Sequence, residues 1–199
     1  MNTSSKTIVG IDLAAKPLNS TGWALLKDSE ISAKHLFNNK EIVAETVWHA
    51  PTFTAIDASL CLPRDKRQYM READGKMQGK GYPVLPPRFR FMEKLTLRAE
   101  KIALKIKEEG LVIIEVHPVS TRKALNMPAR DWNEIQQIFT GIGLRGDVEK
   151  RSLTPHEIDA ATAALAGYLY KKRKIELIGD AREGYIVVPK KRDWRTLRL

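Results

Sequence analysis

The sequence has little of several things, and each shortage excludes a class of structure. Its 199 residues include one cysteine, Cys61, which excludes an internal disulfide framework and a cysteine-rich zinc site. No apolar run approaches the roughly 18 residues of a membrane span. The N-terminus, Met1–Lys6, is polar, and no signal peptide is visible. We therefore expect a cytoplasmic protein that does not contact a membrane.

Acidic residues are fewer than basic ones. The chain has 34 Lys and Arg against 24 Asp and Glu, a net charge of +10. Such an excess attracts polyanions, of which nucleic acid is the commonest, although many basic proteins only carry a solvated positive surface. The 43% apolar and 29% charged residues are those of an ordinary soluble globular protein. At this length, a single domain over residues 1–199 is the default expectation.

The hydrophobic pattern predicts an α/β domain with a mixed central sheet flanked by helices. Three strands joined by short polar turns come first and predict an antiparallel meander, after which strands and helices alternate. The expected strands are 7–14, 21–27, 30–37, 53–60, 111–117, 175–178 and 185–188, and the expected helices are 39–49, 89–109, 119–126, 131–140 and 155–172. This order is the topology of the RNase H-like fold, and also of one half of an actin-like ATPase.

Three acidic residues are set in otherwise apolar strands. Asp12 lies in the first strand, Asp57 in the fourth, and Glu115 in the fifth with His117 on its face. If the two later strands flank the first, the three carboxylates meet at the C-terminal edge of a parallel core. Such a cluster of like charge needs a compensating cation, and carboxylate ligands favour Mg²⁺ or Mn²⁺ over zinc. Asp12 taken alone could equally cap a turn.

A fourth acid comes from the last long helix. Thr154, Pro155 and Glu157 form a strong helix start, with an N-cap, a proline in the first turn and a capping box. His156 and Asp159 then project from one face of that helix, and the small residues that follow allow close packing on the sheet. Asp159 alone is better explained by the helix dipole. Together with the strand acids it is predicted to be a fourth ligand.

Over almost its whole length the chain resembles a family of uncharacterised prokaryotic proteins described as predicted RNase H-like nucleases. The segments that carry the resemblance are Gly10-Ile11-Asp12-Leu13-Ala14, Thr21-Gly22-Trp23-Ala24, Ile56-Asp57-Ala58, Glu115-Val116-His117-Pro118, His156-Glu157-Ile158-Asp159-Ala160-Ala161, Glu183-Gly184, and, in an insertion, Arg71-Glu72-Ala73-Asp74-Gly75 and Pro86-Pro87. More distantly, His156-x-x-Asp159-Ala is similar to the last catalytic helix of RuvC-type junction resolvases, whose Asp ligates metal. The resemblance implies a two-metal phosphodiesterase.

In that role, two divalent ions about 3.5–4 Å apart would hold the scissile phosphate, one activating water and the other stabilising the leaving oxygen. The predicted ligands and catalytic residues are Asp12, which would bridge the ions, Asp57, Glu115 and Asp159. His117 and His156 would orient ligands or move a proton. For either histidine, a structural role at a strand end or helix start is the simpler explanation.

A long basic insertion, residues 62–88, is the expected substrate contact. Between Pro63 and Met92 lie eight Lys or Arg and three acids, and loops of this length are usually functional or disordered. Aromatic residues among these cations predict a stacking platform for single strands, with Tyr82 the first candidate, Phe89 the second and Phe91 assigned to the core. A solvated surface explains about half of the set equally well. The predicted nucleic-acid contacts are Lys16, Arg64, Lys66, Arg67, Arg71, Lys76, Lys80, Tyr82, Arg88, Phe89 and Arg90.

These expectations together favour a Mg²⁺- or Mn²⁺-dependent nuclease that prefers single-stranded DNA, with exonuclease action as one form and RNA as the alternative substrate. Two alternatives stay open. A non-catalytic nucleic-acid-binding module explains the charge but not the four carboxylates. An actin-like phosphotransferase shares the Gly-x-Asp strand, but no second phosphate-binding half is evident in 199 residues. The sequence does not specify the oligomeric state.

Overall fold

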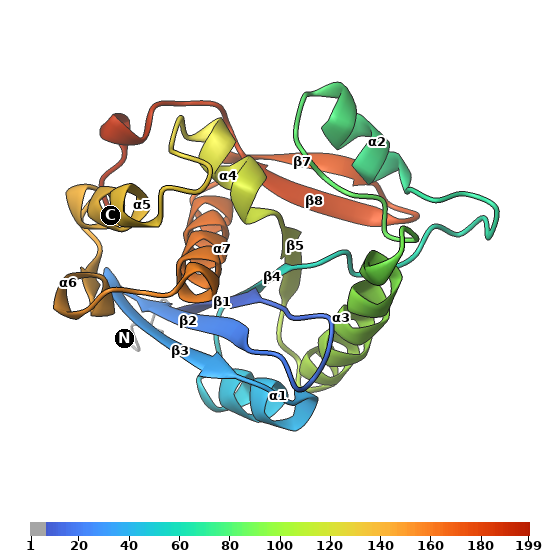
Figure 1. The fold of residues 1–199 in the computed structure, drawn as a ribbon, viewed down its shortest axis with the longest axis horizontal. Helices are drawn as coiled ribbons and strands as arrows, with labels where there is room; N and C mark the ends of the chain where they lie inside the picture. The colour runs from blue at the N-terminus through green and yellow to red at the C-terminus, as the bar shows by residue number, and fades with distance from the viewer. Residues whose placement is uncertain (1–6) are drawn as a thin grey trace.

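A single eight-stranded sheet forms the centre of the molecule, and helices cover both of its faces (Figure 1). The structure is a computed structural model, and it describes residues 7–199. The prediction that there is no signal peptide concerns Met1–Lys6, and these residues lie outside the described range. Within the described range, no helix combines the length and apolar composition that crossing a membrane requires.

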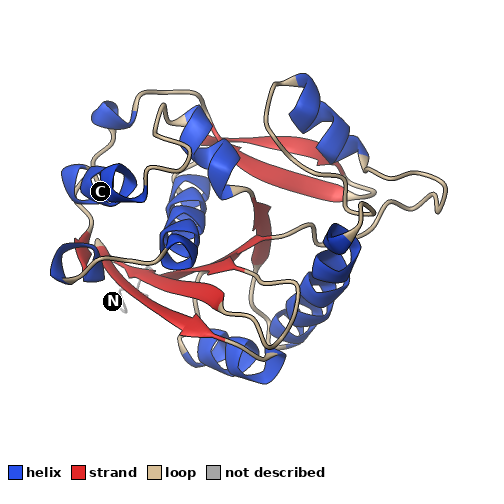
Figure 2. Ribbon diagram, viewed as in Figure 1, coloured by secondary structure: helices blue, strands red, loops and turns tan. Residues whose placement is uncertain are grey.

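Every predicted strand and helix is present. Figure 2 distinguishes the helices from the strands. The strands are β1 Thr7–Asp12, β2 Thr21–Lys27, β3 Glu30–Leu36, β4 Phe53–Asp57, β5 Ile113–Val116, β6 Arg145–Gly146, β7 Ile175–Asp180 and β8 Gly184–Pro189. The helices are α1 Asn39–Trp48, α2 Glu72–Gly79, α3 Phe91–Glu108, α4 Pro118–Ala124, α5 Trp132–Gly141, α6 Asp147–Lys150 and α7 Pro155–Lys171, with a 3₁₀ turn at Trp194–Thr196. Among these elements, β6, α2 and α6 were not predicted.

The sheet order is β6-β3-β2-β1-β4-β5-β8-β7. Strands β1, β2 and β3 form the predicted antiparallel meander, and β4, β5 and β8 follow β1 in parallel. The predicted RNase H-like arrangement is therefore confirmed. One expectation was wrong: β5 pairs with β4 and does not flank β1, so Glu115 lies one strand further from Asp12 than predicted.

Helix α7 lies against the sheet face formed by β1, β2 and β4, and two glycines permit its close approach. A Cβ at Gly10 would lie 2.0 Å from the carbonyl oxygen of Ala160, and a Cβ at Gly22 would lie 2.0 Å from that of His156. Neither distance is physically possible, because backbone atoms cannot move aside as a side chain can. The N-terminal half of α7 therefore rests directly on the backbone of β1 and β2.

Helices α1 and α3 cover the opposite face. Ile102 and Ile106 of α3 pack there with Val9 and Ile11 of β1, as the predicted apolar stripe requires. The expectation that Phe91 is core was wrong, since its side chain is 58% exposed. Helix α3 begins at Phe91 rather than at Phe89, so Phe91 occupies the helix end, beyond the part that packs on the sheet.

The basic insertion is not the open loop that was expected. It contains α2, whose Ala73 and Met77 pack on the hairpin of β7 and β8 at the upper edge of the sheet in Figure 1. Tyr82 joins the same cluster and is only 4% exposed. The predicted stacking role of Tyr82 is therefore wrong, because a buried ring has no free face for a base.

Candidate active site

Asp12 and Asp57 end the two central parallel strands side by side. They are register partners between β1 and β4, and neighbouring strands lie about 4.8 Å apart. Partners at one level of a parallel pair point to the same face of the sheet. For this pair it is the face of Gly10, which α7 covers. Two carboxylates thus leave the sheet next to each other, at its C-terminal edge.

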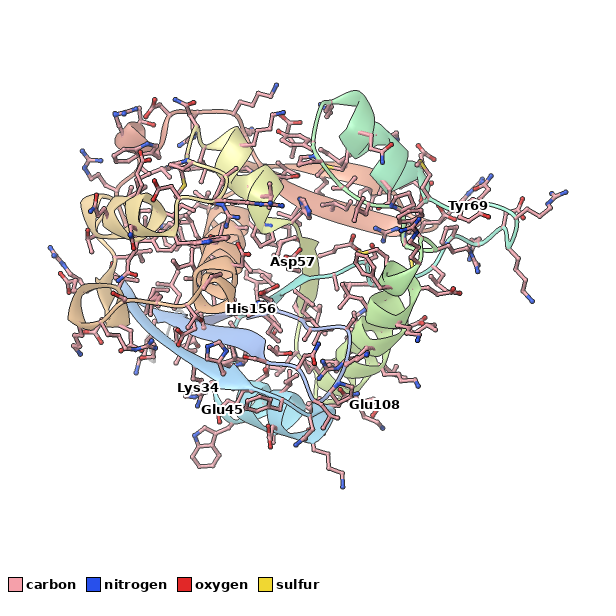
Figure 3. All side chains as sticks on the ribbon, viewed as in Figure 1. Lys34, Glu45, Asp57, Tyr69, Glu108 and His156 are labelled. Atoms are coloured by element: carbon pink, nitrogen blue, oxygen red, sulfur yellow. The ribbon has the colours of Figure 1, made fainter. Side chains whose placement is uncertain are left out.

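Helix α7 adds two more side chains to this point. Its start is the predicted capping box: the Thr154 side chain accepts from the Glu157 N–H, and the Glu157 carboxylate accepts from that of Thr154. In the first turn, His156 places Nδ1 at 2.6 Å from Oδ2 of Asp12. Asp159 follows one turn later, and its charge acts on Asp57. Figure 3 shows His156 and Asp57 between α7 and the strand ends.

The electrostatics of the cluster show a carboxyl group in need of a cation. Burial raises the pKa of Asp57 well above its usual range, and the charges of Asp12 and Asp159 raise it further. Arg122 opposes these effects only in part. In the described part of the chain no hydrogen bond to the Asp57 carboxylate is present. Burial likewise raises the pKa of Asp159. The hydrogen bond between His156 and Asp12 raises the pKa of His156.

Arg122 is the functional candidate that sequence analysis missed. It comes from α4, is fully buried, and forms an ion pair with Asp159. Nothing in the local pattern distinguishes it, because a basic residue in the last turn of a short helix is ordinarily a surface residue that complements the helix dipole. Its contact with α7 spans 37 positions of the sequence.

Glu115 lines the same cleft as Asp12 and Asp57, and its charge raises the pKa of Asp57, but its own carboxylate is paired elsewhere. Its register partner in β4 is Ile56, whereas that of Asp57 is Val116, so Glu115 points to the opposite face of the sheet. There its carboxylate accepts hydrogen bonds from Arg71 at 2.6 and 2.8 Å, and from the Leu60 N–H at 2.9 Å. The prediction of Glu115 as a free metal ligand is corrected, because a buried arginine already neutralises it.

The same contact corrects the prediction for Arg71. Its side chain is 1% exposed and bridges Glu115 and Asp74, so it cannot reach a phosphate. Arg88 is half-buried and donates to the Pro63 carbonyl at 2.9 Å. The other predicted contacts lie on the surface: Lys16, Arg64, Lys66, Arg67, Lys76, Lys80, Phe89 and Arg90.

His117 has the structural role that was the simpler explanation. It caps α4, and its Nδ1 accepts the Ser120 N–H at 3.2 Å. Burial and the charge of Arg122 lower the pKa of His117 to about 4. The imidazole is therefore neutral at physiological pH, with its proton on Nε2.

A cleft of about 320 Å³ runs along this edge of the sheet. Its polar wall includes Asp12, Asp57 and His117, and Arg130 adds one exposed cation. The apolar wall of the cleft is the part lined by Pro83, Val84, Leu85, Met92, Leu95, Val119 and Ile186. The site thus combines carboxylates suited to a charged group with a surface suited to a flat apolar one.

The donor chemistry of the aspartates fits a hard divalent ion such as Mg²⁺ or Mn²⁺. In the present arrangement, no three Asp, Glu, His or Cys side chains of residues 7–199 are grouped closely enough to hold an ion. Cations of the protein occupy part of the cluster instead, since His156 pairs with Asp12 and Arg122 with Asp159. Asp57, which has no such partner, is the carboxyl that an ion would satisfy first.

No family model matches the sequence, and no curated protein sequence matches it. Among solved structures, RuvC of Thermus thermophilus is similar with a TM-score of 0.45 at 14% identity, over 84% of this chain and 96% of that chain. Thermus thermophilus RuvC in complex with a Holliday junction substrate gives a TM-score of 0.49 at 15% identity, with the same coverage. Both scores are low, so the function is inferred from this chain's own side chains.

Proposed function

We propose that the protein is a divalent-metal-dependent nuclease that hydrolyses phosphodiester bonds at the Asp12–Asp57 edge of the sheet. The observation that carries the proposal is Asp57: a carboxyl with a raised pKa, without a hydrogen bond from any described residue, and the register partner of Asp12 with Asp159 close by. Asp12, Asp57 and Asp159 would hold two Mg²⁺ or Mn²⁺ ions. The bound metal would supply an activated water and stabilise the leaving oxygen. His156, hydrogen-bonded to Asp12, would orient that carboxylate and hold a proton.

The proposed substrate is nucleic acid with unpaired bases, and single-stranded DNA is favoured. The net charge of +10 supports a polyanionic substrate. The apolar wall of the cleft supports the unpaired state, since a base stacked in a duplex cannot turn its face to Leu85 or Met92. This wall replaces the stacking surface that was predicted at Tyr82.

Comparing end-labelled with internally labelled strands distinguishes exonuclease from endonuclease action.

The test is a cleavage screen on labelled single-stranded, duplex, hybrid and branched substrates, with Mg²⁺, Mn²⁺ or EDTA. We expect metal-dependent cleavage that Asp12→Asn abolishes while the circular dichroism spectrum stays unchanged. Asp28→Asn, in the exposed turn between β2 and β3, is the matched control and should cleave like the wild type. Substantial cleavage by a folded Asp12→Asn protein would contradict the assignment of Asp12 as an essential metal ligand.

Binding of nucleic acid without cleavage is the second candidate. It is favoured by one observation, that Arg122 and His156 already pair with two of the aspartates. In this case the protein binds single strands equally well in Mg²⁺ and EDTA, and none of the substrates in the screen is cut. The actin-like alternative loses support, because the described residues form a single sheet and not two such halves.

A further inference from the structure

Arg122 lies in the interior beside the candidate metal ligands, and the function proposed above assigns it no role. Its Nη1 donates to Oδ1 of Asp159 and, at 3.2 Å, to Oγ1 of Thr162. Its Nε donates to the Ala129 carbonyl at 3.2 Å, and the guanidinium centre lies 5.4 Å from the ring centre of Trp132. These contacts hold the fully buried guanidinium between α4 and α7.

These contacts leave part of the hydrogen-bonding capacity of the Arg122 guanidinium unused, unlike that of a well-paired structural arginine. Its Nη2 is buried and has no hydrogen-bond partner among the described residues, and an unmade bond of a buried donor costs free energy. What the guanidinium provides instead is charge. It lowers the pKa of both Asp57 and Asp159, against the effect of burial on each. Arg122 therefore acts as a counter-ion of the acid cluster.

A divalent ion and the Arg122 guanidinium would both bind the carboxylate of Asp159. Arginine stays charged at any pH that the protein survives, so it cannot yield by losing a proton. Its charge also repels an ion at the neighbouring carboxylates, and this repulsion is strong in a partly buried site. The ion pair through Oδ1 of Asp159 must loosen if that oxygen is to reach an ion.

We propose that Arg122 is an internal competitor of the metal ion for Asp159. The inference rests on the proposed function, because it concerns regulation of the same site. In the metal-free protein Arg122 holds Asp159 and balances the charge of Asp57; metal binding transfers Asp159 from the guanidinium to the ion. The chain consequently binds divalent ions more weakly than its three aspartates would without Arg122. Metal loading is thereby coupled to a rearrangement between α4 and α7.

The experiment measures Mn²⁺ affinity of the whole chain by isothermal titration calorimetry, without nucleic acid, and the Mn²⁺-dependent rise in Tm. Arg122→Gln should bind Mn²⁺ at least about tenfold more tightly than the wild type, because the competing contact and its charge are gone. Arg122→Lys keeps the positive charge but loses the planar guanidinium, and its Mn²⁺ affinity should lie between those of the wild type and Arg122→Gln. Arg151→Gln is the matched control: it removes the ion pair with Glu157 at the start of α7 and should leave the affinity unchanged.

Unchanged or weaker Mn²⁺ affinity in a folded Arg122→Gln protein would overturn the proposal, since Arg122 would then support Asp159 as a ligand. If Arg122→Gln does not fold, Arg122→Lys decides: tighter binding supports competition, and equal or weaker binding overturns it. Absence of Mn²⁺ binding in every variant also overturns it. A wild-type chain that binds Mn²⁺, loses it in Asp12→Asn and cleaves nothing refutes the nuclease but leaves this proposal standing.

Discussion

Asp12 and Asp57 are register partners on adjoining parallel strands, so their carboxylates leave the sheet at one level and on one face. Strand pairing holds the two backbone positions beside each other. The charge of Asp12 accordingly raises the pKa of the Asp57 carboxyl. Removing one of the two charges relieves this repulsion and leaves the strand pairing intact.

Asp57→Asn should stabilise the metal-free protein. The folded-state pKa of Asp57 is raised, chiefly by burial, so this carboxyl lowers the stability of the fold as pH rises above the ordinary pKa of an aspartate and has no such effect below it. At pH 7 we expect Tm to rise by about 3 °C or more, the effect of roughly 1 kcal/mol in a chain of this length. The difference should vanish near pH 3. Thermal melts across this range, without metal, measure it, and a lower Tm for the variant at pH 7 contradicts the account.

Gly10→Ala should destabilise the fold strongly. The added Cβ would lie 2.0 Å from the Ala160 carbonyl oxygen, so α7 must move off the sheet at a cost of about 3 kcal/mol. Gly79→Ala is the control, since a Cβ there meets nothing within 4 Å and should be neutral or stabilise by up to about 1 kcal/mol. Urea unfolding of both variants measures the two costs. Equal midpoints would show that α7 does not rest on the strand backbone.

The contribution of His156 to stability should depend on pH. Its hydrogen bond to Asp12 raises the pKa of the imidazole, so the stabilisation is fully present below the ordinary pKa of about 6.5 and is lost as pH rises through the folded-state value. The Tm difference between wild type and His156→Ala should therefore shrink from pH 5.5 to pH 9. In an Asp12→Asn background the same substitution should show no such trend. A difference that grows with pH would reverse the assignment.

Leu85→Asp should weaken cleavage of single strands selectively. Leu85 lines the apolar wall of the cleft and is 48% exposed, and contact with an unpaired base is worth about 1–3 kcal/mol. We expect kcat/KM on a single strand to fall about tenfold and that on a blunt duplex to change little. Leu104→Asp, on the outer surface of α3 with 57% exposure, controls for added charge. Equal losses on both substrates would mean that the wall does not contact bases.

The local features of the fold were predictable because they are encoded over a few residues. Strand β2 and the start of α7 lie where the sequence analysis placed them, since alternation and a capping box are short-range signals. The same signals located Asp12, Asp57 and Asp159 on elements that converge. What made that convergence possible, the absence of side chains at Gly10 and Gly22, was visible only once the packing of α7 was known.

The features that escaped prediction depend on distant partners. Glu115 was expected to meet the aspartates at the C-terminal edge, but the sequence did not specify its register against β4, and a shift of one residue in strand register reverses the direction of every side chain. Arg71 was assigned to a mobile surface because its partner Glu115 lies 44 positions away. Tyr82 was expected to be exposed and Phe91 to be buried, whereas the structure buries Tyr82 and exposes Phe91. Amphipathic spacing does not specify where along its length a helix begins to contact its neighbour.

The burial of Arg71 links the insertion to the sheet more firmly than its composition suggests. Arg71 and Asp74 belong to the segment of α2 and would leave the sheet together. Separating α2 from the sheet would therefore leave the buried Glu115 carboxylate without its cation, and breaking a buried pair typically costs about 3–5 kcal/mol. The insertion should therefore not open as a separate lid. In native-state hydrogen exchange, the amides of α2 are expected to lose protection together with those of β5, as one cooperative unit rather than as a surface loop.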